Sequence, residues 1–304
     1  MKTITKTILI TLLAVIGWSG SVNAQQTTPF AIPDAHFFNY LINNTAINTD
    51  FDGSIGFISV AEAANYSGGI YVSGLSIASL TGISAFTALT QLNCSSNQLT
   101  SLNVSANRAL TVLVCNNNQL TSLNVSYNTG LVYLYCHENQ LTSLNIFANT
   151  GLVYLICNNN QLTNLNVSTN TGLVYLYCYD NQLKSLNVSA NTGLVYFYCY
   201  NNQLTSLNVQ NGNNGNIPNG NFYAFGNPNL TCIQVDNVAY SSANWTHIDT
   251  GAHFSTNCPG IVSIPDAIFK AALVGNPDIN TNRDTEIQCS EAAAYTGEIG
   301  RAHV

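Results

Sequence analysis

The chain has 304 residues, of which 46% are hydrophobic and only 7% are charged, and its formal net charge is -7. This hydrophobic content excludes a charge-rich disordered tail. Seven basic residues against fourteen acidic ones leave no basic stripe, which excludes a nucleic-acid-binding surface.

The first 24 residues have the layout of a secretory signal peptide. Lys2 and Lys6 give a basic start, an apolar stretch runs from Ile8 to Ile16, and Val22-Asn23-Ala24 offers a small-residue cleavage site. The apolar stretch is shorter than the roughly 20 residues that a membrane-spanning helix needs. We therefore predict cleavage near Ala24, a mature chain without a membrane span, and a protein that is secreted or held at the cell surface.

Residues 25–69 are predicted to form a helix-loop-helix cap. Pro33 suits the first position of a helix, and Asp34 suits the positive end of the same helix. Gly68 suits the stop after the second helix.

From about residue 70 to residue 210 the sequence repeats every 21 residues. One period, from Leu131 to Gly151, reads LVYLYCHENQLTSLNIFANTG. Six cysteines mark the period, and they are Cys94, Cys115, Cys136, Cys157, Cys178 and Cys199. Self-similarity at this spacing indicates a solenoid. We expect each L-x-x-L-x-C segment to form a short strand with leucine and cysteine pointing inward, and the repeated asparagine to bond backbone groups inside the coil.

The frame L-x-x-L-x-(L/C)-x-x-N-x-L resembles the leucine-rich repeat family, in particular the internalin-like class of secreted bacterial surface proteins. The resemblance implies a leucine-rich repeat solenoid: a right-handed superhelix with a parallel β-sheet on the concave face and a helix-poor convex side. It also implies a small helical N-terminal cap and a C-terminal cap, which we place at residues 211–260.

The cysteines are expected to differ in role. The C-terminal caps of similar secreted proteins are often closed by a disulfide, which implies a bond between Cys232 and Cys258. The six repeated cysteines are expected to stay free thiols, because neighbouring strands lie about 4.8 Å apart and a disulfide prefers a Cβ separation of roughly 3.8 Å.

A second, longer repeat marks the end of the chain. Ile32-Pro33-Asp34-Ala35 recurs as Ile264-Pro265-Asp266-Ala267, and Ile47-Asn48-Thr49 recurs as Ile279-Asn280-Thr281. We expect residues 261–298 to be the truncated start of a second copy of the module. Residues 299–304 look like a sequencing artefact, so the chain is expected to be an N-terminal fragment.

The loop that opens at Asn280 has acidic and amide residues at the spacing of an EF-hand calcium loop. The candidate ligands, a possible calcium site, are Asn280, Asn282, Asp284, Glu286 and Glu291. Thr285 replaces the expected glycine at place six, and the first copy of the loop has Glu62 three residues too far along. A polar turn between two helices is the alternative for both loops.

The outward positions of the predicted strands are rich in tyrosine. Nine of the sixteen tyrosines fall on this surface, and they are Tyr133, Tyr135, Tyr154, Tyr175, Tyr177, Tyr179, Tyr196, Tyr198 and Tyr200. Tyrosine offers a large amphipathic contact area at a low cost in entropy, which favours recognition of a partner. The alternative is that tyrosine favours strands and stacks with its own copies along the sheet.

The sequence has no serine elbow, no phosphate loop and no paired carboxylates in a pocket-forming context, so we expect no catalysis and no required cofactor. We expect an exported scaffold that binds a protein or a glycan at the cell surface through the tyrosines. The rival hypothesis is a structural spacer, or adhesin stalk, that presents a further C-terminal domain, and that domain could be enzymatic.

Overall fold

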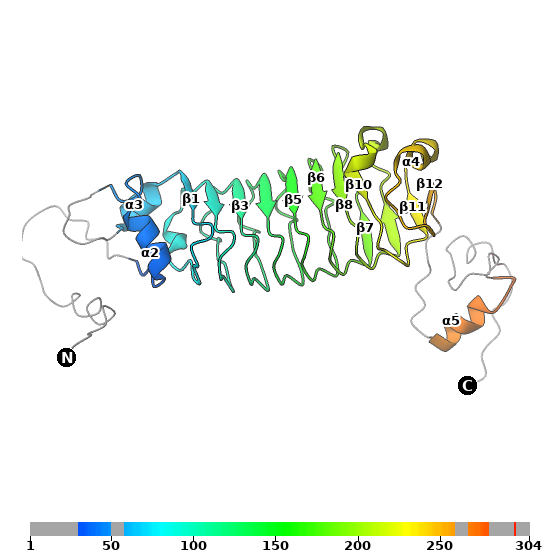
Figure 1. Cartoon of the computed structure of the whole chain (residues 1–304), viewed down its shortest axis with the longest axis horizontal. Helices are drawn as coiled ribbons and strands as arrows, with labels where there is room; N and C mark the ends of the chain where they lie inside the picture. Colours follow the sequence, from blue (N-terminus) through cyan, green and yellow to red (C-terminus); the bar gives the residue numbers. More distant parts are fainter. Residues whose placement is uncertain (1–29, 50–57, 259–266, 280–294, 296–304) are drawn as a thin grey trace, which may run out of the picture.

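The computed structural model describes residues 30–49, 58–258, 267–279 and 295 of the chain. It is an elongated solenoid in which short strands lie side by side along the long axis (Figure 1). The α-helices are α2 (Ala35–Ile42), α3 (Val60–Asn65), α4 (Val238–Asn244) and α5 (Ala267–Val274). The described residues also contain three short 3-10 helices, η2 (Ile83–Ala85), η3 (Asn214–Asn216) and η4 (Asn219–Asn221). None of the helices in the described ranges is long and apolar enough to cross a membrane.

The strands form two parallel sheets. The longer sheet has the order β1 (Gly69–Tyr71), β2 (Gln91–Asn93), β3 (Val112–Val114), β4 (Tyr133–Tyr135), β5 (Tyr154–Ile156), β6 (Tyr175–Tyr177), β8 (Tyr196–Tyr198) and β10 (Phe222–Tyr223). The shorter sheet has the order β12 (His253–Ser255), β11 (Cys232–Gln234), β9 (Ser206–Asn208) and β7 (Ser185–Asn187). The predicted helix-poor solenoid with a parallel sheet is therefore confirmed. Both sheets continue beyond residue 210, where the sequence placed the end of the repeats.

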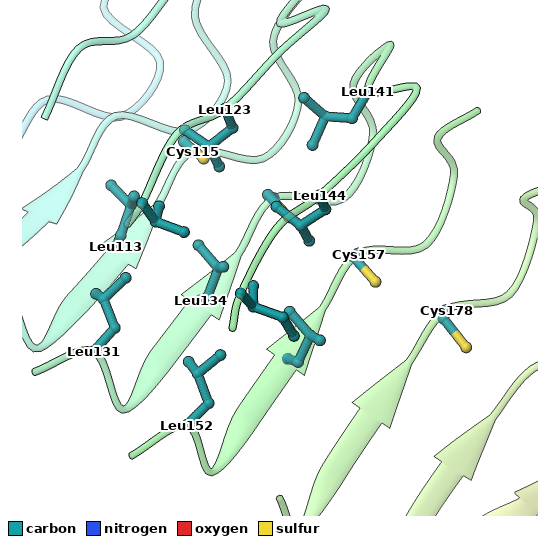
Figure 2. Close-up of a cluster of buried hydrophobic side chains, with 14 of the residues drawn as sticks. Leu113, Cys115, Leu123, Leu131, Leu134, Leu141, Leu144, Leu152, Cys157 and Cys178 are labelled. Carbon is teal, nitrogen blue, oxygen red and sulfur yellow. The ribbon is translucent and has the colours of Figure 1, made fainter. Parts of the chain in front are cut away.

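The interior is built from the repeated leucines and cysteines. In most strands of the longer sheet the middle residue is buried and its two neighbours are half-buried, because successive side chains point to opposite faces. Figure 2 shows the result: Leu113, Leu134 and the cysteines of successive turns lie inside the coil. The six repeated cysteines are fully buried free thiols, as predicted. Burial raises the pKa of the Cys94 and Cys136 thiols to about 12, so they are neutral.

An asparagine ladder ties each turn to the one before it. The Asn139 amide donates to the carbonyls of Cys115 at 3.1 Å, Cys136 at 3.2 Å and His137 at 3.2 Å. Its Oδ1 accepts the backbone N–H of Leu120 at 2.9 Å. The equivalent bonds recur in the neighbouring turns. Backbone groups at the bend, which pair with no strand, are satisfied in this way.

A second ladder runs along the opposite bend. Asn128 is fully buried, and its amide donates to the carbonyl of Val104 at 3.0 Å and to that of Asn107 at 2.8 Å in the preceding turn. Asn149, Asn170 and Asn191 repeat this arrangement. The Asn-Thr-Gly segments, such as Asn128-Thr129-Gly130, therefore have two roles. They reverse the direction of the chain, and their asparagines hydrogen-bond one solenoid turn to the preceding one.

The N-terminal cap is fastened by one carboxylate. Asp34 is the N-cap of α2, and its Oδ1 accepts the N–H groups of His36 and Phe37. Its Oδ2 accepts the N–H groups of Ala78 and Ser79, across the junction with the solenoid. The helix begins at Ala35 because this side chain caps it, so Pro33 lies outside the helix and the prediction of a first helical position for it was wrong.

The second cap helix, α3, ends earlier than the sequence predicted. Ser59 and Glu62 form a capping box at its start, and Tyr66 is its C-cap, so the helix stops before Gly68.

At the other end of the solenoid, Cys232 and Cys258 form the predicted disulfide, with Cα atoms 5.7 Å apart. Trp245 is buried beneath this end, stacked on Phe222 with ring centroids 4.0 Å apart.

Helix α5 lies 232 residues after α2, in agreement with the offset of the longer sequence repeat. Leu273 and Ile279 form a small separate cluster, and the equivalent residues in the cap, Leu41 and Ile47, are buried in the main core. A second copy of the cap at residues 261–298 stays a prediction that these helix bounds support.

Replacing Asn139 by alanine should lower the free energy of unfolding by about 2–4 kcal/mol, because three carbonyls and one N–H lose their partner inside the coil. Urea denaturation followed by circular dichroism measures the change. The exposed neighbour Gln140 provides the control, and Gln140→Ala should change stability by less than about 0.5 kcal/mol. Equal effects of the two substitutions would contradict the ladder as the source of stability.

The Asp34 clamp should make the cap sensitive to acid. Partial burial raises the pKa of this carboxyl, but four backbone N–H donors outweigh that effect and hold the pKa below its usual value. The clamp therefore stabilises the fold above the unfolded pKa of about 3.9, and this contribution is lost as the pH falls through the folded pKa. Asp34→Asn should melt below the wild type at neutral pH, and the two melting temperatures should converge as the pH falls through the folded pKa of Asp34. A constant difference across that range would rule out the clamp.

Candidate functional site

The longer sheet positions the nine predicted tyrosines on its outward face. Each three-residue strand points its first and third side chains outward, and the residue after the inward cysteine also faces this side. The first row contains Tyr133, Tyr154, Tyr175 and Tyr196; the second contains Tyr135, Tyr177 and Tyr198; the third contains Tyr179 and Tyr200. We call this surface the tyrosine face.

Tyrosines of one row that lie on neighbouring strands stack on one another along the sheet. In the first row, ring centroids lie 4.6 Å apart for Tyr133 and Tyr154, and 4.2 Å apart for each following pair. Tyr177 stacks on Tyr198 at 4.4 Å, and Tyr179 on Tyr200 at 4.3 Å. Interplanar angles between 3° and 19° make these parallel stacks. The stacking alternative raised by the sequence is therefore present in the structure.

Stacking and exposure coexist on this face. All nine rings are half-buried, and eight of them stack on a tyrosine of the neighbouring turn. The ninth, Tyr135, is flanked in the sheet by Val114 and Ile156. Parallel rings on adjacent strands turn their planes across the long axis, so solvent meets mainly ring edges and hydroxyl groups. The tyrosine face is consequently a set of rigid aromatic stacks with polar tips, an arrangement that costs little entropy to immobilise against a partner.

Two further aromatic residues, Tyr223 and Phe225, extend the rows, and His247 stacks on the first of them. Tyr223 continues the second row and stacks on His247 at 4.2 Å, and Phe225 continues the third row on Tyr200 at 4.9 Å. Sequence reasoning missed them because an insertion breaks the 21-residue period. The signal was present: Phe222-Tyr223-Ala224-Phe225-Gly226-Asn227 matches Phe197-Tyr198-Cys199-Tyr200-Asn201-Asn202.

The environment of the hydroxyls keeps them neutral. Hydrogen bonds with the Tyr196 hydroxyl, followed by burial, raise the pKa of Tyr175 to about 12. Burial and the neighbouring Tyr179 raise the pKa of Tyr200 to about 12. Burial also raises the pKa of Tyr177, Tyr179 and Tyr198. At physiological pH these side chains donate and accept hydrogen bonds and carry no charge.

The charged groups beside the tyrosine face are acidic. Glu138 and Asp180 occupy the same place in two turns, at backbone φ angles of 53° and 51° in the left-handed region. Asp180 accepts a hydrogen bond from the Asn201 amide at 2.8 Å. The two bases within the repeats lie elsewhere: Arg108 covers the Tyr127 ring at 5.5 Å, and Lys184 immediately precedes β7 in the other sheet.

His137 lies next to Glu138 at the edge of the face. Burial lowers the pKa of its imidazole, and the nearby Glu138 carboxylate opposes this shift. The ring is therefore neutral at physiological pH and offers one acceptor nitrogen.

The predicted calcium ligands Asn280, Asn282, Asp284, Glu286 and Glu291 lie outside the described residues, so that site stays a prediction. In the first copy of the loop, Glu62 accepts the backbone N–H and the hydroxyl of Thr49 and closes the capping box with Ser59. Within the ranges that the structure describes, no group of three or more histidine, cysteine or carboxylate side chains could hold a metal ion.

No protein-family model matches the sequence, and no curated protein matches it either. Solved structures do resemble the fold. An internalin (InlF) of Listeria monocytogenes has a TM-score of 0.57 and 22% identity, and the match covers 76% of this chain and 74% of that one. This likeness shows the fold, a leucine-rich repeat solenoid.

Two further solved structures from the same organism resemble the chain less closely in space. The functional domain of InlJ, which includes a cysteine ladder, has a TM-score of 0.43 and 26% identity, and the match covers 72% of this chain and 59% of that one. Internalin C2 has a TM-score of 0.44 and 21% identity, with coverage of 60% and 92%. The chain thus matches little more than half of the length of the InlJ domain.

Tyr175, Tyr177 and Tyr200 should ionise at a higher pH than free tyrosine, because their pKa values are raised. An ultraviolet titration of tyrosinate should show a fraction of the tyrosines ionising only above about pH 11 in the native protein, and all of them ionising near pH 10 in denaturant. Because the folded pKa values are raised, the stacks stabilise the fold below about pH 10, and that contribution is lost as the pH rises through about 12. Identical native and denatured titrations would contradict these raised pKa values.

Proposed function

We propose that this protein is an exported recognition scaffold that binds a protein partner at the cell surface through the tyrosine face, without catalysis of its own. The observation that carries the proposal is the concentration of aromatic side chains in three adjacent rows on one side of the longer sheet. Interfaces are enriched in tyrosine because one side chain combines apolar area with a hydrogen-bonding tip.

The geometry favours a protein over a glycan as the partner. A sugar ring packs best on an open aromatic face, but within each row the faces cover one another at 4.2–4.6 Å. The edges and hydroxyls that remain form a broad, rigid surface, which fits the extended contact area of a protein interface. Glycan binding therefore ranks second among the ligand classes predicted from the sequence.

The localisation follows from different observations. The signal-like segment at residues 1–24 lies outside the described residues, and the prediction of export depends on its sequence. The Cys232–Cys258 disulfide supports the same conclusion, because disulfides form and persist in oxidising compartments.

The structural spacer remains the rival function. The ring stacking is consistent with a spacer, because stacked tyrosines stabilise the sheet without any partner. The two functions differ in one measurable respect. A recognition surface loses affinity when its central rings are removed, whereas a spacer loses only stability.

The double substitution Tyr177→Ala and Tyr198→Ala removes the central stack of the second row. We expect the wild type to retain partners on an array of surface proteins, and the double variant to lose about 10- to 100-fold in affinity, because a few aromatic anchors carry most of the binding energy. Circular dichroism and thermal melting confirm that the solenoid survives.

Tyr127→Ala is the matched control, since this ring is half-exposed at the bend and does not belong to the tyrosine face. It should leave partner binding unchanged. If the wild type binds nothing on protein or glycan arrays, the spacer function is favoured. Binding that survives the double substitution would place the interface elsewhere.

A further inference from the structure

The segment between β9 and β10, where the 21-residue period is broken, contains three Asn-Gly pairs. The pairs are Asn211-Gly212, Asn214-Gly215 and Asn219-Gly220. In such a pair the next backbone nitrogen can reach the side-chain carbonyl carbon of asparagine, and glycine puts no side chain in the way. Asparagine is also one of the chemically labile residues. The three pairs therefore share one possible reaction and differ only in their surroundings.

Two of the pairs are protected by burial. Asn211 is 3% exposed and Asn214 is 1% exposed. The Nδ2 of Asn211 donates to the carbonyl of Asn191 at 3.0 Å, and the Nδ2 of Asn214 donates to the carbonyl of Val209 at 2.7 Å. These side chains can neither rotate toward the backbone nor release their nitrogen without the loss of a buried hydrogen bond.

The third pair is open. Asn219 and Gly220 are exposed. Among the described residues, nothing accepts a hydrogen bond from the Nδ2 of Asn219 or from the backbone N–H of Gly220. The Oδ1 of Asn219 accepts the backbone N–H of Thr246 at 3.0 Å and the hydroxyl of Thr246 at 3.1 Å. Both nitrogens are thus free to react, and two donors polarise the carbonyl group that would be attacked.

The backbone at this pair is lightly held. Helix η4 is a single turn, closed by a hydrogen bond from the Asn221 N–H to the Pro218 carbonyl at 2.9 Å. A Cβ added to Gly220 would meet no atom within 4 Å beyond its chain neighbours, so this glycine packs against nothing. Exposed single turns of this kind open locally at little cost in free energy. Such an opening brings the Gly220 nitrogen to the Asn219 side chain.

We propose that Asn219 is a site of spontaneous deamidation. The Gly220 nitrogen loses its proton and attacks the Cγ of Asn219, a C–N bond forms, and the side-chain nitrogen leaves as ammonia. Water then opens the resulting cyclic imide at either of its carbonyls, which gives aspartate or isoaspartate at this position. Water is the only other reactant, and both products carry a negative charge that asparagine lacks.

Deamidation at this position alters the end of the tyrosine face. The Tyr198 hydroxyl donates to the Gly220 carbonyl at 3.1 Å, and β10 begins shortly afterwards, at Phe222. Isoaspartate lengthens the backbone by a methylene group, which displaces this carbonyl from the Tyr198 hydroxyl. The modification stands whether or not the tyrosine face binds a partner.

The test incubates the whole chain, native and in denaturant, at mildly alkaline pH. Peptide mass spectrometry follows deamidation at each pair, and enzymatic methylation of isoaspartate provides a second readout. In the native protein Asn219 should convert at least about tenfold faster than Asn211 and Asn214, and in denaturant the three should convert at similar rates. Conversion should be faster at higher pH, because the Gly220 nitrogen must lose its proton.

Gly220→Ala is the matched control variant. Its added Cβ meets open space, and Gly220 does not adopt a left-handed φ, so circular dichroism and thermal melting should stay unchanged. The methyl group hinders the attacking nitrogen and should slow the conversion of Asn219 about tenfold.

Each outcome decides the proposal. It is overturned if Asn219 stays intact in the native protein while the denatured chain deamidates. Equal conversion of the three pairs in the native protein also overturns it, because the protection of the two buried pairs would then be absent. Conversion of Gly220→Ala at the wild-type rate would show that the reaction does not pass through the Gly220 nitrogen, and it too would overturn the proposal.

Discussion

The repeat of 21 residues places each side chain directly beside its own copy in the next turn, and the rest of the structure depends on this register. Leu134 pairs with Leu155, and Tyr175 pairs with Tyr196, without a shift along the longer sheet. The two asparagine ladders hold the register, because each amide bonds backbone groups of the preceding turn at fixed points. Single turns of this kind are too small to fold alone, so stability comes from such contacts between neighbours.

The same register restricts which residues the outward face can carry. Identical charges in successive turns would lie about 5 Å apart and repel, which accounts for a repeat region nearly free of charge. Tyrosine is favoured instead, because its rings attract one another when they stack. Where carboxylates do occur, at Glu138 and Asp180, the uncharged Asn159 separates them.

Much of this architecture could be predicted from the sequence. The inward Leu134 and Cys136, the bonding role of Asn139 and the Cys232–Cys258 disulfide follow from the period and from the family resemblance, and all are present. Local end effects could not be predicted, because they depend on contacts between segments distant in sequence. Asp34 starts α2 at Ala35 by binding N–H groups of the solenoid as well as those of its own helix.

The candidate site was predicted in part. The nine tyrosines were found because they share the repeat frame, but Tyr223, Phe225 and His247 lie beyond an insertion that breaks it. The parallel ring stacking was considered only as an alternative to recognition, although the structure combines stacking with an exposed polar edge. Ring orientation depends on packing between turns, which a residue pattern does not specify.

Specificity in such a molecule must come from departures from the repeat. A perfectly periodic face offers the same contacts in every turn, so a partner could bind in several registers with similar affinity. A departure at one turn removes this degeneracy. Ile156 interrupts the second tyrosine row in the turn between the two carboxylates, and so it marks one position along the sheet. If a partner binds the tyrosine face as proposed, the regular rows supply rigid contact area, and the interruption at Ile156 fixes the position along the solenoid at which the partner binds.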